Sequence, residues 1–271
     1  MSTTFRARFR QIGAVVGLEA RRNLAGRQAI GLYVLAVMPM GPALSFLLPD
    51  NPRVPLEEIP MLFAKLFQGA YLPFLTFFAC ASIFSDLFRR DIVQKSLHYW
   101  LLAPIRREVL ALGKLAGAML TVIVVFELST LGTYMSYYVP YGSEIMERQL
   151  LSRTSLHALG AYLLTTAVAV VSYSVLFFAI GLCFKSPIIP GLIIWLWESV
   201  NNFLPSVLKC FSLIYYLKAL LPVEVHEDIF ALSSDPPTPW LSAAGLLVFA
   251  LVCMTVAVFQ VRKLEVSYAA E

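Results

Sequence analysis

Hydrophobic residues fill four long stretches of the chain that contain no Asp, Glu, Lys or Arg. These stretches cover residues 28–49, 66–85, 154–184 and 236–261. Each is close to or longer than the ~20 residues that a helix needs to cross the hydrocarbon core of a membrane. Because backbone groups in lipid must be hydrogen-bonded within the segment itself, the stretches are predicted to be helices. The pattern therefore predicts an all-α, polytopic membrane protein.

Two further stretches are apolar apart from isolated charges. Residues 110–139 contain only Lys114 and Glu127, and residues 186–208 contain only Glu198. With both included, the predicted transmembrane helices number six, at 29–49, 66–85, 110–139, 156–184, 186–208 and 240–261. The stretch 211–223 is too short to cross and is predicted to be re-entrant or interfacial.

These elements divide one predicted transmembrane domain, 1–271, into consecutive parts. They are an interfacial helix (1–28), spans one and two (29–85), a cytoplasmic coupling-helix loop (86–109), spans three to five (110–208), an external re-entrant region (209–239), span six (240–261) and a cytoplasmic tail (262–271).

Composition agrees with a membrane protein. The chain is 59% hydrophobic and 14% charged, whereas soluble domains carry about 45–50% apolar and about 25% charged residues. The four cysteines show no CxxC spacing, so neither a metal site nor a disulfide framework is predicted. We also expect no nucleic-acid partner.

Basic residues predict the orientation. With six spans, 15 of the 21 Lys and Arg fall on the side that carries both termini and the 86–109 loop. Cytoplasmic loops carry an excess of Lys and Arg. We therefore expect a multi-pass protein of the cell (inner) membrane with both termini in the cytoplasm.

The N-terminal segment has an apolar stripe at helical spacing. Its members are Phe5, Phe9, Ile12 and Val16. Together with the arginines of this segment, the stripe predicts an amphipathic helix lying in the cytoplasmic interface of the bilayer. The alternative is a segment whose charges only fix orientation. Because Glu19 falls on the apolar face, the helix is expected to bend or end near Gly17.

The loop 84–114 reads "FSDLFRRDIVQKSLHYWLLAPIRREVLALGK". A charged section comes first, followed by an aromatic and leucine patch, a proline and two arginines. Residues 92–102 are predicted to form a short amphipathic helix that Pro104 limits. A helix joined closely to spans two and three would act as a lever, because moving it would move both spans.

The section "SLHYWLLAPIRREVLALGK" of this loop resembles the corresponding loop in permeases of ABC-2-type exporters. The matching positions are Leu97, Leu101, Leu102, Pro104, Arg107, Gly113 and Lys114. The usual Gly-Thr is replaced by Lys95-Ser96, and Arg106 stands where the family often has Ser. The resemblance implies a coupling helix at about 86–102 that docks on a cytoplasmic ABC ATPase subunit. Candidate docking residues are Asp86, Arg89, Arg90, Asp91, Leu97, Tyr99, Trp100, Leu101, Leu102, Pro104 and Arg107.

The resemblance also implies how energy enters. The chain has no G-x-x-x-x-G-K-[ST] phosphate loop, so we expect no catalytic residues, no ATP hydrolysis by this chain and no cofactor of its own. ATP and Mg would be held by the partner ATPase. A second permease chain, identical or different, would complete an exporter of an amphipathic or hydrophobic substrate.

Polar residues inside two spans are candidates for a substrate path or a subunit contact. They are Glu127, Glu198, Asn201 and Asn202. A carboxylate at the bilayer centre costs about 2.5–3.5 kcal/mol on insertion scales, so such residues rarely face lipid. The alternative is a structural acid that holds helices together through hydrogen bonds. The two acids also leave open a different function, an ion-coupled secondary carrier or channel.

Overall fold

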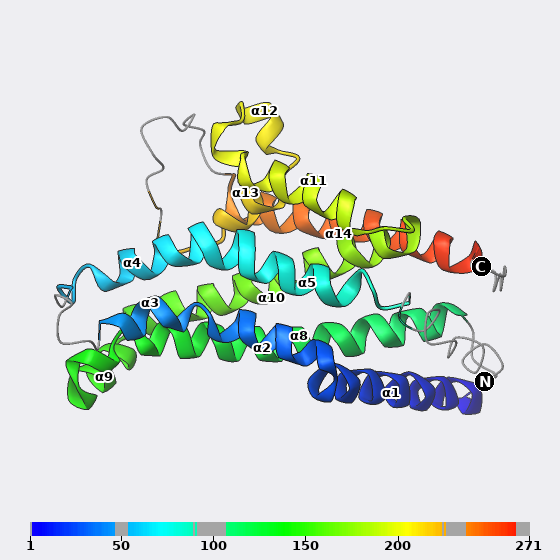
Figure 1. Ribbon diagram of the computed structural model, residues 1–271, viewed down its shortest axis with the longest axis horizontal. Coiled ribbons are helices and arrows are strands. Elements are labelled where there is room, and N and C mark those ends of the chain that lie inside the picture. The colour runs from blue at the N-terminus through cyan, green and yellow to red at the C-terminus, as the bar shows by residue number, and fades with distance from the viewer. Residues whose placement is uncertain are drawn as a thin grey trace.

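The computed structural model describes residues 2–46, 54–88, 90, 107–223, 225 and 237–263. Over these residues the fold is helical and contains no strand, which confirms the all-α prediction (Figure 1). The elements are α1 (Ser2–Ala25), α2 (Arg27–Val37), α3 (Met40–Ser45), α4 (Ile59–Leu66), η1 (Phe67–Thr76), α5 (Phe77–Phe84), α8 (Arg107–Ser136), η2 (Val139–Tyr141), α9 (Ser143–Leu150), α10 (Arg153–Cys183), α11 (Ile188–Ser199), η3 (Asn201–Phe203), α12 (Ser206–Lys209), α13 (Leu213–Lys218) and α14 (Pro239–Lys263).

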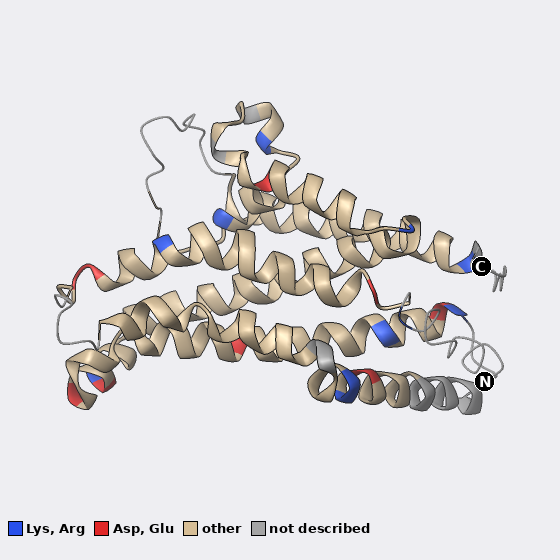
Figure 2. Ribbon diagram, in the orientation of Figure 1, with Lys and Arg blue, Asp and Glu red and all other residues tan. Residues whose placement is uncertain are grey.

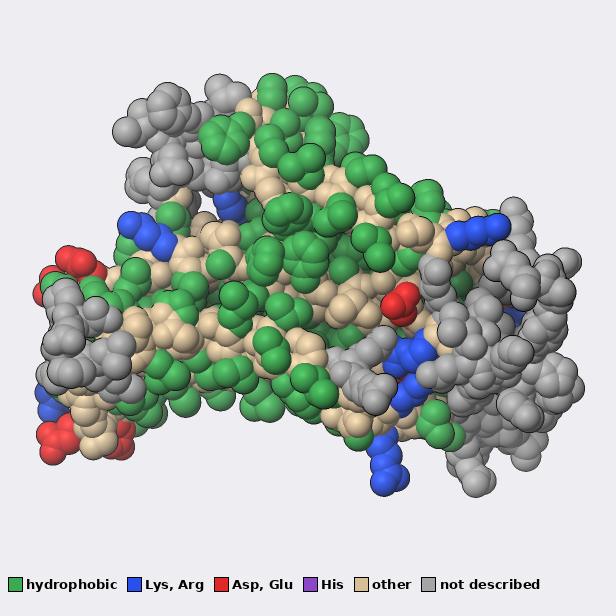
Figure 3. All heavy atoms as spheres, in the orientation of Figure 1, with side chains coloured by type: hydrophobic (Ala, Val, Ile, Leu, Met, Phe, Trp, Pro, Cys, Tyr) green, Lys and Arg blue, Asp and Glu red, His purple; other side chains and the backbone are tan. Residues whose placement is uncertain are grey.

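Among the described residues, four helical segments are long and apolar enough to cross a membrane. They are Ile59–Phe84, Arg107–Tyr141, Arg153–Cys183 and Pro239–Arg262. They correspond to the second, third, fourth and sixth spans predicted from the sequence. Hydrophobic side chains also cover much of the central surface in Figure 3. These features indicate a membrane-embedded protein.

The first and fifth predicted spans look different in the structure. The first is divided into α2 and α3 at Pro39, which lies between the two helices. Proline has no N–H to donate and its ring clashes with the preceding turn, so a helix breaks or kinks there. The fifth is represented by α11, which has 12 residues. Six spans therefore stay a prediction.

The second span is a continuous rod built from α4, η1 and α5. It begins at Ile59, earlier than the predicted residue 66, and η1 is a π-helical segment that contains Pro73. Proline removes one backbone donor from the helical ladder, and a wider turn is one way for a helix to accommodate it. The π-helical segment was not predicted, because periodicity of apolar residues does not distinguish it from an α-helix.

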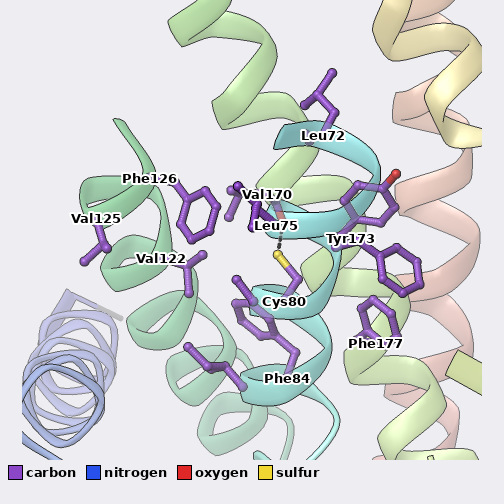
Figure 4. Close-up of a cluster of buried hydrophobic side chains, with 14 of the residues drawn as sticks. Leu72, Leu75, Cys80, Phe84, Val122, Val125, Phe126, Val170, Tyr173 and Phe177 are labelled. Atoms are coloured by element: carbon purple, nitrogen blue, oxygen red, sulfur yellow. Dashed lines mark hydrogen bonds between the residues drawn. The ribbon is translucent and has the colours of Figure 1, made fainter. Parts of the chain in front are cut away.

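The core lies where this rod packs against α8 and α10. Figure 4 shows side chains from the three elements pointing toward one another, including Phe84 from α5, Phe126 from α8 and Phe177 from α10. A chain of buried hydroxyls joins the same elements. The Tyr71 hydroxyl donates to the Phe126 carbonyl at 2.9 Å. Thr130 Oγ1 lies 2.9 Å from the Tyr71 hydroxyl and 3.1 Å from Thr166 Oγ1. Such bonds hold membrane helices together where apolar contact alone has little specificity.

Charge is distributed unevenly along the bundle. The end that holds α1, the start of α8 and the end of α14 carries Arg21, Arg22, Arg90, Arg107, Lys114, Lys185 and Arg262, together with the acids Glu19, Asp86 and Glu108 (Figure 2). The opposite end carries Glu57, Glu58, Glu144 and Glu147, together with Arg148 and Arg153. We call the first the basic end. The orientation of the chain in the membrane stays a prediction.

Two glycines of α10 provide a test of this packing. A Cβ atom added at Gly181 would lie 2.9 Å from the Cα atom of Ser85 at the end of α5, whereas one added at Gly160 would meet nothing within 4 Å. Gly181→Ala is expected to lower the free energy of unfolding by about 1–3 kcal/mol through overpacking. Gly160→Ala should leave it unchanged or raise it, because alanine is the better helix former. Thermal unfolding of both purified variants in detergent checks this; equal midpoints would contradict the close contact.

Candidate functional site

The predicted docking loop is only partly described. The two flanks of the loop are described: Asp86 and Arg90 follow α5, and Arg107 begins α8. Asp86 and Arg90 are half-buried and Arg107 is exposed. The remaining docking candidates lie outside the described residues: Arg89, Asp91, Leu97, Tyr99, Trp100, Leu101, Leu102 and Pro104. Both flanks lie at the basic end (Figure 1), so what can be examined is how these flanks are held.

The first half of α8 is packed closely against α1, its most extensive contact partner. Glycines on α8 make this possible. A Cβ atom at Gly113 would lie 2.9 Å from the Val15 side chain, and one at Gly117 would lie 2.7 Å from the Val16 carbonyl oxygen. Small residues four apart let two helix backbones approach closely. We call this contact the glycine seam.

A buried ion pair lies within the glycine seam. Lys114 Nζ is 3.3 Å from Glu19 Oε2, and the side chains are 0% and 1% exposed. Lys114 stands between the two glycines in sequence, so the close approach that they permit also excludes water from the pair. The Lys114 Nζ is in addition 5.8 Å from the centroid of the Phe88 ring, within the range of a cation–π contact. The pair therefore connects α1, α8 and the end of the second span.

A second polar contact connects the same elements. The Arg90 Nη1 donates to the Asn23 Oδ1 at 3.5 Å, and Asn23 is buried one helical turn after Glu19. The ion pair, this hydrogen-bonded pair and the Phe88 ring form what we call the basic-end cluster: Glu19, Asn23, Phe88, Arg90 and Lys114. It adjoins both ends of the 91–106 loop. An exposed pair adds α14, since Arg262 Nε lies 2.7 Å from Glu108 Oε1.

The structure revises the interpretation of the N-terminal segment. The predicted end near Gly17 is wrong, because α1 continues from Ser2 to Ala25. Glu19 does not interrupt the helix, because its carboxylate faces α8 and pairs there. Ile12 and Val16 are half-buried, and the side chains of Phe5 and Phe9 lie outside the described part. α1 runs beside α8 (Figure 1), and its place in the membrane interface stays a prediction.

Sequence reasoning missed this cluster, although one signal was present. Glu19 and Asn23 continue the stripe of Val15 at four-residue spacing, so one face of the helix changes from apolar to polar without leaving the buried side. In the sequence, Lys114 stands out only as a charge inside a span and as a position of the loop resemblance, and neither predicts Glu19 as its partner. Glu19 on an apolar helix face and Lys114 inside an apolar span are each unexpected alone, and the structure shows that they form an ion pair.

The Glu198 carboxylate is held by hydrogen bonds at the start of α13. Its carboxylate accepts hydrogen bonds from the Ser212 hydroxyl at 2.8 Å and from the backbone N–H groups of Leu213 and Ile214 at 2.9 Å each. Glu198 is 4% exposed. A carboxylate at these positions satisfies N–H groups that the first turn of α13 leaves without partners. This geometry matches the predicted alternative of an acid that holds helices together.

Of the other polar candidates, Asn201 follows Glu198 by three residues, whereas Glu127 lies on a different helix. Asn201 is buried, and its Oδ1 has no hydrogen-bond partner within the described part of the chain. The Asn202 side chain lies outside that part. Glu127 is half-buried on α8, on a side of the helix that also presents exposed Leu120, Val124 and Leu128. Figure 1 shows α8 and α11 on opposite sides of the rod formed by α4, η1 and α5.

No metal or disulfide site is formed by the described residues. No group of three or more His, Cys, Asp or Glu among them could hold a metal ion. The four cysteines are all free.

In comparisons with known proteins, no family model matches the chain and no curated protein is significantly similar to it. The resemblance of residues 96–114 to the ABC-2 permease loop therefore stays a prediction.

Proposed function

We propose that the chain is the permease subunit of an ABC-2-type exporter, driven by a separate cytoplasmic ATPase. The observation that carries the proposal is the basic-end cluster. The segments that enter and leave the 91–106 loop are both held against α1 by polar contacts, Arg90 through a part-buried hydrogen bond to Asn23 and Lys114 through a buried ion pair with Glu19. If a partner moved the loop, the two spans that contain α5 and α8 would therefore move with it.

The proposal includes six spans, both termini in the cytoplasm and a paired permease, either with a second copy or with a different chain. In it, α1 is the connecting helix, residues 86–102 the coupling helix, and α12 and α13 belong to the external re-entrant region. The ATPase would hold ATP and Mg. Long apolar spans with few internal charges suit an amphipathic or hydrophobic substrate, such as a lipid, peptide, drug or lipid-linked glycan.

An ion-coupled carrier or channel is the other candidate that the sequence leaves open. It has less support, because the Glu198 carboxylate is occupied by three hydrogen bonds and Glu127 lies on a different side of the bundle. A carrier or channel would also leave the amphipathic loop at 84–114 without a function.

The test is a pull-down of the tagged chain from its native membranes in a gentle detergent, with every co-eluting protein identified. The proposal expects a stoichiometric ATPase with a Walker motif, because a permease without a phosphate loop needs a partner chain that binds the nucleotide. If the chain elutes without any ATPase, while other membrane complexes survive the same detergent, the exporter function is contradicted and a carrier or channel is favoured.

A further inference from the structure

We propose that the outer face of α8 around Glu127 is the surface on which a second copy of this chain docks, with the two Glu127 carboxyl groups hydrogen-bonded to each other. The inference rests on the paired permease of the proposed function and adds to it the surface and the residue of the contact. Its test needs no ATPase.

Glu127 lies at the depth of the hydrocarbon core. It is near the middle of Arg107–Tyr141, one of the helical segments long and apolar enough to cross a membrane. Thr130, three residues further along α8, has its hydroxyl 3.1 Å from that of Thr166, which is near the middle of the spanning segment Arg153–Cys183. Both helices therefore place Glu127 close to mid-depth, where an ionisable side chain without a partner is costly.

The chain supplies no partner for this carboxyl group in the part that the structure describes. Glu127 makes no hydrogen bond and no ion pair there. The neighbouring hydroxyls of α8 are engaged elsewhere, since Ser129 donates to the Ala36 carbonyl and the Thr130 hydroxyl has its acceptors in the core. Glu127 is only half-buried, so its partner is expected from outside the chain.

The side chains around Glu127 form a continuous apolar row. Ala116, Leu120, Val124 and Leu128 follow one another at four-residue spacing, and all are exposed. Residues at this spacing lie along one side of a helix. Glu127 follows Leu120 by seven residues, two turns, and lies on the same side. We call Ala116, Leu120, Val124, Glu127 and Leu128 the α8 face.

Other exposed apolar surfaces of the bundle do not require a second chain. α14 also has an exposed apolar side, but it contains no Asp, Glu, Lys or Arg between Trp240 and Val261. Lipid tails cover such side chains as well as another helix does. A carboxyl group differs, because lipid tails offer it no hydrogen bond. The α8 face is therefore where a second helix gains most.

Symmetry and the chemistry of the carboxyl group identify the partner as a second copy. Two copies inserted in the same direction are related by a two-fold axis along the membrane normal, so a residue near the axis meets its own copy at equal depth. A carboxyl group that carries its proton can donate to its copy, whereas two carboxylates would repel each other.

A basic partner for Glu127 is not available from another copy of this chain. The spans contain no Lys or Arg near mid-depth. The stretches without either residue are 66–88, 115–147, 154–184 and 219–261. An ion pair would therefore need a different membrane protein, whereas the carboxyl pair needs only this one.

Disulfide crosslinking in liposomes tests the surface. Single cysteines are placed at Val124→Cys on the α8 face and, as matched controls, at Leu164→Cys on α10 and Val252→Cys on α14, all exposed positions. The background replaces the three cysteines that are not buried: Cys183→Ala, Cys210→Ala and Cys253→Ala. With a membrane-permeant oxidant, Val124→Cys should give a crosslinked dimer and both controls should stay monomeric.

The role of the carboxyl group is tested by the dissociation constant of the dimer. Two pools of the chain, labelled with donor and acceptor fluorophores, are diluted with increasing amounts of lipid. Glu127→Leu should weaken pairing by about 5- to 30-fold, the loss of one hydrogen bond between membrane helices. Glu127→Gln should stay close to the natural chain, because an amide both donates and accepts. Glu127→Leu should unfold at or above the natural temperature, which excludes misfolding as the cause.

Each contrary result overturns a defined part. A chain that stays monomeric, or that crosslinks at a control position and not at Val124→Cys, removes the α8 face as the contact. Pairing of Glu127→Leu as tight as that of the natural chain removes the carboxyl group from it. A crosslink in native membranes between Val124→Cys and a different membrane protein, without a dimer, overturns the second copy as occupant. If the copies pair on α8 but no ATPase co-elutes in the pull-down, the proposed exporter fails and this contact stands.

Discussion

Replacing Glu198 by alanine is expected to loosen the short helices that follow α11. The variant removes a carboxylate that accepts three hydrogen bonds and leaves the Ser212 hydroxyl and the Leu213 and Ile214 N–H groups without that partner. A buried donor that loses its acceptor costs about 1–3 kcal/mol, so we expect the free energy of unfolding of this region to fall by roughly 3 kcal/mol or more.

The measurement is cleavage by trypsin after Lys209, which is 4% exposed and lies between Glu198 and α13. Cleavage there should be slow in the natural chain and fast in Glu198→Ala. Glu198→Gln should be intermediate, because its amide keeps one acceptor oxygen. Glu144→Ala is the matched control, since Glu144 is an exposed acid of α9. Equal protection of Lys209 in all four proteins would return Glu198 to the substrate-path hypothesis.

Replacing Leu102 by aspartate is expected to abolish recovery of the ATPase without preventing membrane insertion. Under the proposed function, Leu101 and Leu102 belong to the apolar side of the docking loop. Truncating a well-packed interface residue costs 2 kcal/mol or more at binding hot spots, and a buried charge adds to this loss. We therefore expect binding to weaken by about 30-fold or more, since every 1.4 kcal/mol is a factor of about ten.

The matched control is Leu151→Asp, the same substitution at an exposed leucine at the opposite end of the bundle. Recovery of the ATPase with this variant should equal that of the natural chain. Leu101→Asp should behave like Leu102→Asp. Normal recovery with both loop variants would remove residues 86–107 as the docking element, even if an ATPase still binds elsewhere.

The sequence by itself determined the helical class and the position of most long helices. Three of the four charge-free stretches, 66–85, 154–184 and 236–261, lead to this result directly, because the length of an apolar run and the need for internal hydrogen bonds in lipid are local constraints. The predicted and observed bounds of α10 and α14 differ by only a few residues. Pro39 and Pro73 each disturb the helix in which they stand. The sequence alone does not distinguish a break, as at Pro39, from a π-helical segment, as at Pro73.

Only the tertiary structure decided what the isolated charges do. Glu19 and Lys114 are 95 residues apart in sequence, and Glu198 reaches backbone groups that follow it by 15 and 16 residues. No periodicity links such residues, since their contact depends on which helices meet and in what alignment. A charge in an apolar segment predicts that a partner exists, because an unpaired charge there is too costly. The identity of that partner follows from the packing of α1 on α8 and from the turn that brings the first residues of α13 to Glu198 at the end of α11.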